Sequence, residues 1–187
     1  MTQKAKRVAA RILKRAKKIQ LLLMDVDGTL TDGQVCLISN MATGELSELK
    51  IFDAHDGAGL TLAHIMGIKT GLITGRNSGA TAQRAKEMKI DYVYQGRARK
   101  VESYEECQKL SGVSDDATAY LGDDLPDIPL LKRAGLAVAT ANAVPEVKKV
   151  AHIVTRASGG RGAAREVVEL ILRAQGRWNR AIPNALA

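Results

Sequence analysis

The chain has 187 residues, of which 26% are charged, and a formal net charge of +8. That length suits one domain, which buries roughly 70% of the surface that its unfolded chain exposes and so needs no disulfide or zinc ion to be stable. The two cysteines, Cys36 and Cys107, are far apart in the sequence and predict neither a disulfide framework nor a zinc site. Its apolar runs fall short of the roughly 20 residues of a membrane span, and the run before Asp25 is too short for a signal-peptide core, so we expect a cytoplasmic protein.

The first predicted element is a basic amphipathic helix. Residues 4–18 hold eight Lys and Arg and no acid, so the 20 other basic residues balance the 20 acidic ones and the remaining chain is neutral. Apolar residues recur at helical spacing in this segment, which favours a packed helix whose basic face meets water. Attraction to an anion or to a membrane surface is the alternative interpretation.

Strands and helices then alternate along the chain. An apolar strand from Leu21 is followed by a predicted β-hairpin with strands at 34–39 and 46–52. Further strands are expected at 68–74, 91–95, 118–122, 136–140 and 152–155, and helices at about 58–66, 79–88, 98–110, 126–133, from Pro145, and 162–174. This order predicts an α/β fold with a doubly wound, Rossmann-like parallel sheet. We divide the chain into an N-terminal helix (1–18), one α/β domain (19–175) and a C-terminal tail (176–187).

Polar residues follow the predicted strands at the edge where ligands bind in such sheets. Asp25 and Asp27 end the first strand, Thr74 ends a second, and Asp123 and Asp124 end a third. Lys100 opens a helix just after another strand. Four separate segments therefore deliver carboxylates, a hydroxyl and an ammonium group to one edge.

This set of groups suits phosphoryl transfer. Clustered carboxylates are tolerated around a hard cation such as Mg²⁺, and an ionised Asp25 can then attack phosphorus and form an aspartyl-phosphate. Asp27, two residues on, can protonate the leaving oxygen and later activate water. Thr74 and Lys100 can hold the phosphoryl oxygens and neutralise their charge.

The ordered motifs "DVDGTL", "LITGR", Lys100 and "GDDLPD" resemble those of the haloacid dehalogenase superfamily of phosphatases. Residues 20–175 are more similar still to the branch that dephosphorylates 3-deoxy-D-manno-octulosonate 8-phosphate, in "DVDGTLTDG", "KIFDAHDGAGL", "LITGRNS", "YQGRARK", "YLGDDLPD" and "SGGRGAAREVVELIL". The resemblance implies Mg²⁺ held by the side chains of Asp25 and Asp123 and the backbone carbonyl of Asp27, with Asp127 in support. It also implies a set of substrate contacts: Asp27, Asp53, Ala54, His55, Asp56, Gly57, Arg76, Arg84 and Lys100.

Two positions depart from that family pattern. Relatives often carry a basic residue where this chain has Thr61, and another where it has His55, so 2-keto-3-deoxynononate 9-phosphate is an alternative substrate. A phosphoacceptor signalling module would use Asp, Thr, Lys and a metal as well, but a positioned acid/base at Asp27 would shorten its signal. A phosphatase acting on nucleic-acid ends is a third hypothesis, which depends on the basic segment 4–18.

The spacing of the motifs leaves no room for a cap domain. Between Asp27 and Thr74 there is space for the hairpin and one helix, and between Thr74 and Lys100 for one helix and one strand. A bare apolar hairpin would be an aggregation-prone edge, so we expect hairpins to pair between subunits in a homotetramer whose neighbours close each other's active sites. Arg161 in "SGGRGAARE" is expected to reach toward a neighbour's phosphate site.

Overall fold

Six short, apolar segments form one parallel sheet. Its strands follow the order β5-β4-β1-β6-β7-β8, with every neighbouring pair parallel. They are β1 (Leu21–Met24), β4 (Lys69–Ile73), β5 (Tyr92–Tyr94), β6 (Thr118–Gly122), β7 (Leu136–Ala139) and β8 (Ile153–Val154). The central strands β1, β6 and β7 are buried along their whole length, as expected for a parallel sheet with both faces covered. The predicted α/β class is confirmed.

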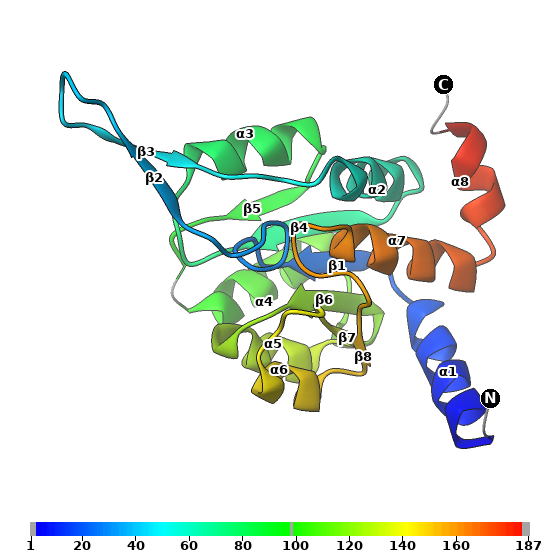
Figure 1. Ribbon diagram of the computed structural model, residues 1–187. Helices are drawn as coiled ribbons and strands as arrows, with labels where there is room; N and C mark the ends of the chain where they lie inside the picture. Colours follow the sequence, from blue (N-terminus) through cyan, green and yellow to red (C-terminus); the bar gives the residue numbers. More distant parts are fainter. Residues whose placement is uncertain (1–2, 98, 185–187) are drawn as a thin grey trace.

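Helices cover both faces of the sheet (Figure 1). One core contains residues from α1 (Gln3–Ala16), α2 (Ala54–Ile65), α3 (Gly79–Glu87), α7 (Ala163–Ala174) and α8 (Trp178–Asn184). The core on the other face contains residues from α4 (Lys100–Ser111), α5 (Ile128–Arg133) and α6 (Pro145–Val150). Short 3-10 turns at Asp115–Ala117 and Leu125–Asp127 complete the helical segments. None of the helices formed by the described residues is long and apolar enough to cross a bilayer.

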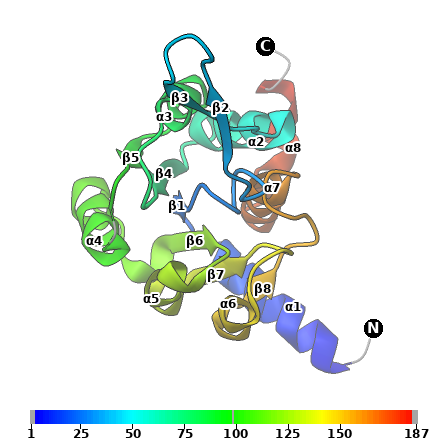
Figure 2. The same ribbon diagram turned by 60° about the vertical axis from the view of Figure 1, so that its left-hand side comes forward.

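The predicted hairpin forms a separate two-stranded ribbon. Strands β2 (Cys36–Ser39) and β3 (Leu46–Leu49) pair in antiparallel fashion and make no ladder with the main sheet. Figure 2 shows the ribbon extending from the body of the molecule above β1, and no cap domain is inserted beside it. Most of its side chains are exposed, including large apolar ones such as Leu46 and Ile51.

The structure describes residues 3–97 and 99–184. The ends of the predicted helix 1–18 and tail 176–187, namely 1–2 and 185–187, lie outside this range, as does Ala98 of the predicted helix 98–110. Helix α2 begins at Ala54 rather than near 58, because the Asp53 side chain caps it by accepting a hydrogen bond from the His55 N–H (2.6 Å). The predicted tail contains α8, whose Ala181 is buried in the core.

Candidate active site

The carboxyl ends of the parallel strands bring the predicted polar residues together. Asp25 follows β1, Thr74 follows β4 and Asp123 follows β6, while Lys100 is the first residue of α4. Asp25, Thr74 and Lys100 are all buried. Because β1 pairs in parallel with both β4 and β6, the ends of these strands lie at one edge of the sheet, as the sequence predicted.

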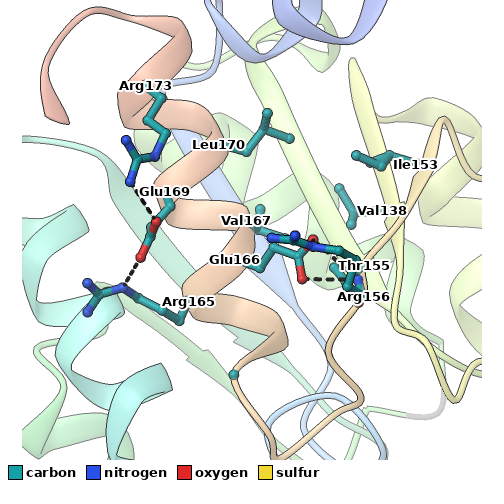
Figure 3. Close-up of a pocket in the computed structure, with 11 residues that line it drawn as sticks. Val138, Ile153, Thr155, Arg156, Arg165, Glu166, Val167, Glu169, Leu170 and Arg173 are labelled. Atoms are coloured by element: carbon teal, nitrogen blue, oxygen red, sulfur yellow. Dashed lines mark hydrogen bonds and ion pairs between the residues drawn. The ribbon is translucent and has the colours of Figure 1, made fainter. Parts of the chain in front are cut away.

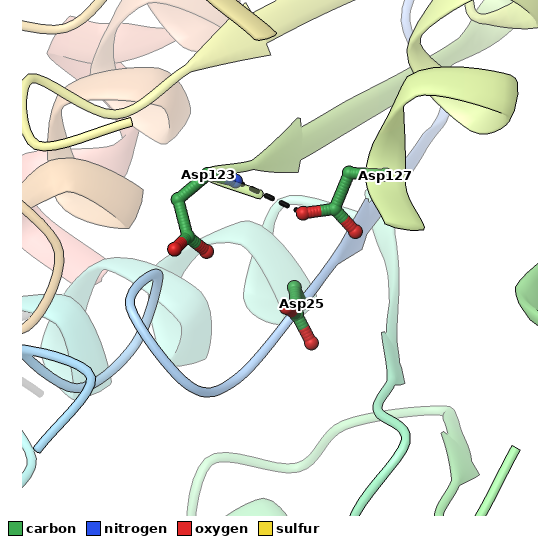
Figure 4. Close-up of side chains that lie close together, drawn as sticks. All are labelled: Asp25, Asp123 and Asp127. Atoms are coloured by element: carbon green, nitrogen blue, oxygen red, sulfur yellow. Dashed lines mark hydrogen bonds between the residues drawn. The ribbon is translucent and has the colours of Figure 1, made fainter. Parts of the chain in front are cut away.

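Three carboxylates form the acidic cluster, which we define as Asp25, Asp123 and Asp127 (Figure 4). One oxygen from each lies within 4.8 Å of the others. Lys100 Nζ links two of them, at 2.9 Å from Asp25 Oδ2 and 2.8 Å from Asp127 Oδ1. The three carboxylates thus have one ammonium group among them, which leaves an excess of negative charge when they are ionised.

Residues around the acidic cluster hold its carboxylates in place. Asp127 accepts hydrogen bonds from the Tyr120 hydroxyl (2.8 Å) and from the backbone N–H of Asp123 (2.9 Å). Asp123 accepts one from the Thr29 hydroxyl (2.8 Å). Sequence reasoning missed Tyr120 and Thr29, although Thr29 lies within the "DVDGTL" motif. Buried hydrogen bonds of this kind orient charged groups that the core could not otherwise tolerate.

The electrostatics of the acidic cluster favour a cation. Burial, reinforced by the charge of Asp127, raises the pKa of Asp25 to about 6 despite Lys100. Burial also raises the pKa of Asp123 to about 7, with Asp25 adding to the effect against the Thr29 hydrogen bond. For Lys100, burial disfavours the charged form, yet Asp25 and Asp127 outweigh it and raise its pKa. Converging carboxylate oxygens with surplus negative charge are a donor set that fits Mg²⁺.

The loop after β1 makes a close approach that requires glycine. Gly28 has a left-handed φ of 87°, and a Cβ there would lie 2.0 Å from Asp123 Oδ2. The segment 158–162 packs on the same loop, where a Cβ on Gly159 would lie 1.9 Å from the Gly28 oxygen. Asn142 joins the two loops, donating to the Gly28 carbonyl (2.9 Å) and accepting from the Gly159 N–H (2.6 Å). Backbone contact thus fixes the loop that carries Asp27.

Asp27 itself points to the hairpin. Its Oδ1 accepts a short hydrogen bond from Lys50, which follows β3, and its Oδ2 lies 3.8 Å from Arg76 Nε. Arg76 also pairs with Glu48 of β3 (2.6 Å). Glu48 and Lys50 were not among the predicted site residues. Lys50 begins the family-like segment "KIFDAHDGAGL", but no role was assigned to it there. For Glu48 the sequence offers only the alternation of charged and apolar residues in "ELKIF", which is common in exposed strands.

The predicted substrate segment 53–57 forms the start of α2, and it divides into inner and outer residues. Asp56 is buried, and both of its oxygens accept backbone hydrogen bonds at the start of α7, from Gly162 N–H (3.1 Å) and Arg165 N–H (2.8 Å). The backbone N–H groups at the start of α7 are therefore bound to the Asp56 carboxylate. Burial raises the pKa of Asp56 against those bonds. His55 and Ala54 are exposed. Their predicted substrate contacts stay predictions.

Arg84 and Thr61 lie beside that segment. The Arg84 guanidinium lies over Gly57, where a Cβ would meet Nη2 at 2.2 Å, and it pairs with Glu87 at 3.0 Å. Its buried Nε has no hydrogen-bond partner within the described part of the chain. Thr61 donates to the Gly57 carbonyl within α2 (3.0 Å). Arg84 therefore has one buried donor without a partner among the described residues, whereas the Thr61 hydroxyl is satisfied by its own helix.

A separate pocket of about 350 Å³ lies between α7 and the strands β7 and β8 (Figure 3). Its charged lining residues pair with one another: Arg165 and Arg173 both contact Glu169, and Arg156 contacts Glu166. No member of the acidic cluster lines it. The pocket has no group poised for the chemistry described above, so the strand ends are the candidate active site.

The chain is similar to known proteins over most of its length. Residues 74–166 match the family of haloacid dehalogenase-like hydrolases. The chain is 39% identical over 174 residues to the 3-deoxy-D-manno-octulosonate 8-phosphate phosphatase KdsC of Escherichia coli K12, covering 93% of this chain and 90% of that protein. It superposes with a TM-score of 0.92 and 40% identity on a putative HAD superfamily (subfamily III A) hydrolase from Legionella pneumophila, covering 99% of each chain.

A further solved structure carries ligands. It is the 3-deoxy-D-manno-octulosonate 8-phosphate phosphatase from Moraxella catarrhalis in complex with magnesium ion, phosphate ion and a KDO molecule. Its TM-score is 0.85 at 39% identity, with 92% of this chain and 97% of that chain covered.

Proposed function

Because the chain belongs to the 3-deoxy-D-manno-octulosonate 8-phosphate (KDO 8-phosphate) phosphatase family of haloacid dehalogenase-like hydrolases, we propose that it hydrolyses KDO 8-phosphate to KDO and inorganic phosphate. The observation that carries the proposal is the buried Asp25, paired with Lys100 at 2.9 Å inside the acidic cluster, with Asp27 two residues further on. A small phosphorylated sugar acid is the substrate class. The cytoplasmic location predicted from the sequence stays a prediction.

The reaction proceeds in two displacements at phosphorus. Asp25 attacks the phosphorus atom, the bond to the sugar oxygen breaks, and Asp27 gives its proton to that oxygen as the sugar leaves. Asp27, now ionised, takes a proton from water, whose oxygen attacks the aspartyl-phosphate. The bond to Asp25 then breaks, phosphate leaves, and both aspartates return to their starting states.

Lys100 and Thr74 position the phosphoryl group in this scheme. Lys100 is held between Asp25 and Asp127, so its ammonium group is fixed beside the attacking oxygen. The Thr74 hydroxyl accepts a hydrogen bond from the Arg76 N–H (3.3 Å), which leaves its proton free to donate to a phosphoryl oxygen. Fixed donors of this kind stabilise charge as it develops in the transition state.

Mg²⁺ is the cofactor that the acidic cluster suits. Asp25 and Asp123 would hold it with the Asp27 carbonyl, while Asp127, already bonded to Lys100 and Tyr120, would orient the other groups. When bound, Mg²⁺ neutralises charge on the phosphate and keeps the neighbouring carboxylates ionised.

We also propose that the working unit is a homotetramer built through the hairpins. The ribbon exposes a set of large apolar side chains, namely Val35, Leu37, Ile38, Met41, Leu46, Leu49 and Ile51. An isolated two-stranded hairpin is marginally stable, and exposed apolar strands pair readily with other chains. Association of hairpins would bury these residues and narrow access to the neighbouring active sites.

The decisive experiment is a substrate panel assayed for phosphate release with Mg²⁺. It contains KDO 8-phosphate, 2-keto-3-deoxynononate 9-phosphate, simple sugar phosphates and a 3′-phosphorylated oligonucleotide. We expect the highest kcat/KM with KDO 8-phosphate. A preference for 2-keto-3-deoxynononate 9-phosphate would make that compound the substrate instead. This alternative is included because His55 is exposed and the Thr61 hydroxyl is bonded within its own helix.

Arg76 provides a second test of substrate class. Its guanidinium is partly exposed beside Asp27 and offers a planar fork suited to a carboxylate. Arg76→Ala should therefore lose far more activity toward a phosphorylated sugar acid than toward p-nitrophenyl phosphate, measured as kcat/KM for each. Equal losses would show that Arg76 does not recognise the sugar acid.

A further inference from the structure

Four charged side chains form a closed ring at the mouth of the active site, which we call the hairpin ring: Asp27, Lys50, Glu48 and Arg76. Their charges alternate, so that each carboxylate lies between two cations. Lys50 Nζ contacts Asp27 and lies 3.5 Å from Glu48, while Arg76 lies 2.6 Å from Glu48 and 3.8 Å from Asp27. The ring is neutral when Asp27 is ionised, as it is after its proton has been transferred. It joins the loop after β1, the loop after β4 and strand β3.

We propose that Lys50 and Glu48 are positioning residues for Asp27, so that the hairpin aims the acid/base of the reaction. The proposal rests on the proposed phosphatase function. Neither residue was among the predicted site residues, although Lys50 begins the segment "KIFDAHDGAGL". Lys50 acts directly on the Asp27 carboxylate. Glu48 acts through Lys50 and Arg76, the two cations on either side of it.

The burial of Lys50 is the first argument. Only 3% of its side chain is exposed, although it is carried by a ribbon that is otherwise mostly exposed. A buried ammonium group is costly unless it is paired, and here it pairs with both Asp27 and Glu48. Without Lys50, those two carboxylates would face each other with only Arg76 to compensate them. Lys50 is thus required for the observed Asp27 orientation.

The two oxygens of Asp27 provide the second argument. Lys50 occupies Oδ1, whereas Arg76 Nε approaches Oδ2 only to 3.8 Å, beyond hydrogen-bond distance. Oδ2 therefore has no close donor among the described residues. Fixing one carboxylate oxygen while leaving the other open is what a residue needs in order to deliver a proton to a leaving oxygen.

The position of Glu48 is the third argument. A hydrogen bond from Ser78, helped by Arg76 and Lys50, lowers the pKa of the Glu48 carboxyl, so it remains charged. Ser78 is also the N-cap of α3, which ties Glu48 to the body of the domain. Along β3 and the residues after it, Glu48 and Lys50 turn inward while Leu49 and Ile51 are exposed. One face of the ribbon therefore serves the active site.

The test compares two aryl phosphates of nearly equal shape. Phenolate is a more basic leaving group than p-nitrophenolate and depends more on a proton donor, and kcat/KM reports the steps up to its departure. We expect Lys50→Met to lower kcat/KM for phenyl phosphate about tenfold more than for p-nitrophenyl phosphate, as a misplaced general acid would. Equal loss on both substrates would overturn the proposal, whatever the natural substrate proves to be.

A double-mutant cycle tests whether Lys50 acts through Asp27. In an Asp27→Asn background, Lys50→Met should change kcat/KM by less than about twofold, because the group that it positions is already inactive. A further loss as large as in the wild type would mean that Lys50 acts independently, and would refute the positioning role. Activity on the substrate panel is scored separately, so failure of the proposed substrate leaves this result readable.

Glu48→Gln is the second variant, in case Lys50→Met does not fold as judged by circular dichroism. We expect the same bias against phenyl phosphate, at about threefold, because Lys50 and Arg76 remain in place. No bias would contradict the proposal. The matched controls are Lys109→Met on α4 and Glu45→Gln near the hairpin tip, both exposed, which should leave the ratio of the two substrates unchanged.

Discussion

The acidic cluster and the hairpin ring lie next to each other but are held in different ways. Groups of the acidic cluster lie at the ends of central strands, and buried donors such as Tyr120 and Thr29 orient them. Two members of the hairpin ring belong to a two-stranded ribbon that has no ladder with the main sheet. Folding of one chain therefore fixes Asp25, the proposed nucleophile, whereas the placement of Asp27, the proposed acid/base, also depends on how the ribbon packs.

This difference suggests a division of labour within the reaction. The attacking carboxylate and the phosphoryl-holding groups need a fixed geometry, which core strands provide. In the proposed mechanism the acid/base and Arg76 would meet the sugar part of the substrate, and a ribbon packed in the proposed assembly would close over that part and exclude water.

The largest effect is expected from Asp25→Asn, which breaks the fixed half. The amide keeps the shape of the side chain but cannot attack phosphorus, so kcat should fall by at least about 10³, a barrier increase of roughly 4 kcal/mol. Phosphate release with KDO 8-phosphate measures the loss, and circular dichroism checks the fold. A variant that retains a tenth of the activity would rule out the covalent mechanism.

The next effect concerns the ribbon. The double variant Leu46→Asp and Ile51→Asp places charges on exposed apolar positions, one of which, Ile51, is 72% exposed. We expect light scattering to show a tetramer for the wild type and a smaller species for the variant, with kcat/KM for the sugar phosphate lowered about tenfold as the ribbon loses its packing. Leu110→Asp, at an apolar position on α4 that is also well exposed (60%), is the control.

A fully active monomer at nanomolar concentration would contradict this expectation. The hairpin would then act on its own subunit alone, and the hairpin ring would be as self-sufficient as the acidic cluster.

The same division explains what could be predicted from sequence. Strand order along the chain, the buried run before Asp25 and the positions of Thr74, Lys100 and Asp123 follow from local patterns that the structure reproduces. The start of α2 could not be predicted in this way, because Asp53 and Asp56 in "FDAHDG" are typical of loops. In the structure Asp53 caps the helix and Asp56 binds the start of α7. A partner more than 100 residues away leaves no local signal.

Lys50 shows the same limit more sharply. In the sequence it is one of many lysines in a strand with alternating exposure, and such lysines usually lie in water. Its burial depends on three segments meeting: β3, the loop after β1 and the loop after β4. Only the folded chain brings these together, so motif reasoning found the residues of the acidic cluster and missed half of the hairpin ring.

A pH titration of stability should report chiefly on the acidic cluster, to which the buried Asp56, whose pKa is also raised by burial, adds an effect of the same sign. Burial raises the pKa of Asp25 to about 6 and that of Asp123 to about 7, from 3.8. Between pH 3.8 and these raised pKa values, the folded protein retains protons that the unfolded chain has released. The contribution of the two carboxyls to stability is therefore present at low pH and is lost as the pH rises through about 6 to 7.

We therefore expect the melting temperature in EDTA to fall by roughly 3 to 6 °C between about pH 4.5 and about pH 7.5, and saturating Mg²⁺ to reverse the fall by binding the ionised carboxylates. Calorimetry measures both. Asp123→Asn removes one of the two groups and should flatten the slope in EDTA. A melting temperature that rises over this range, with the same slope in the variant, would show that these carboxylates are not the source.

The smallest effect is expected from the basic face of α1, far from both halves of the site. α1 leads into the start of β1, whereas the active site lies beyond its end (Figure 1), and four residues of strand span roughly 13 Å. That separation exceeds the screening length of about 8 Å at physiological ionic strength. The triple variant Arg7→Gln, Arg11→Gln and Lys14→Gln, all exposed positions, should therefore change kcat/KM for the sugar phosphate by less than about twofold at that ionic strength.

If the substrate were instead a nucleic-acid end, these cations would contact backbone phosphates and release counterions. Activity on the 3′-phosphorylated oligonucleotide would then fall steeply with salt, and the variant would reduce that slope. Measuring both substrates over a salt series separates the two cases, because only the second one makes α1 part of the substrate-binding surface.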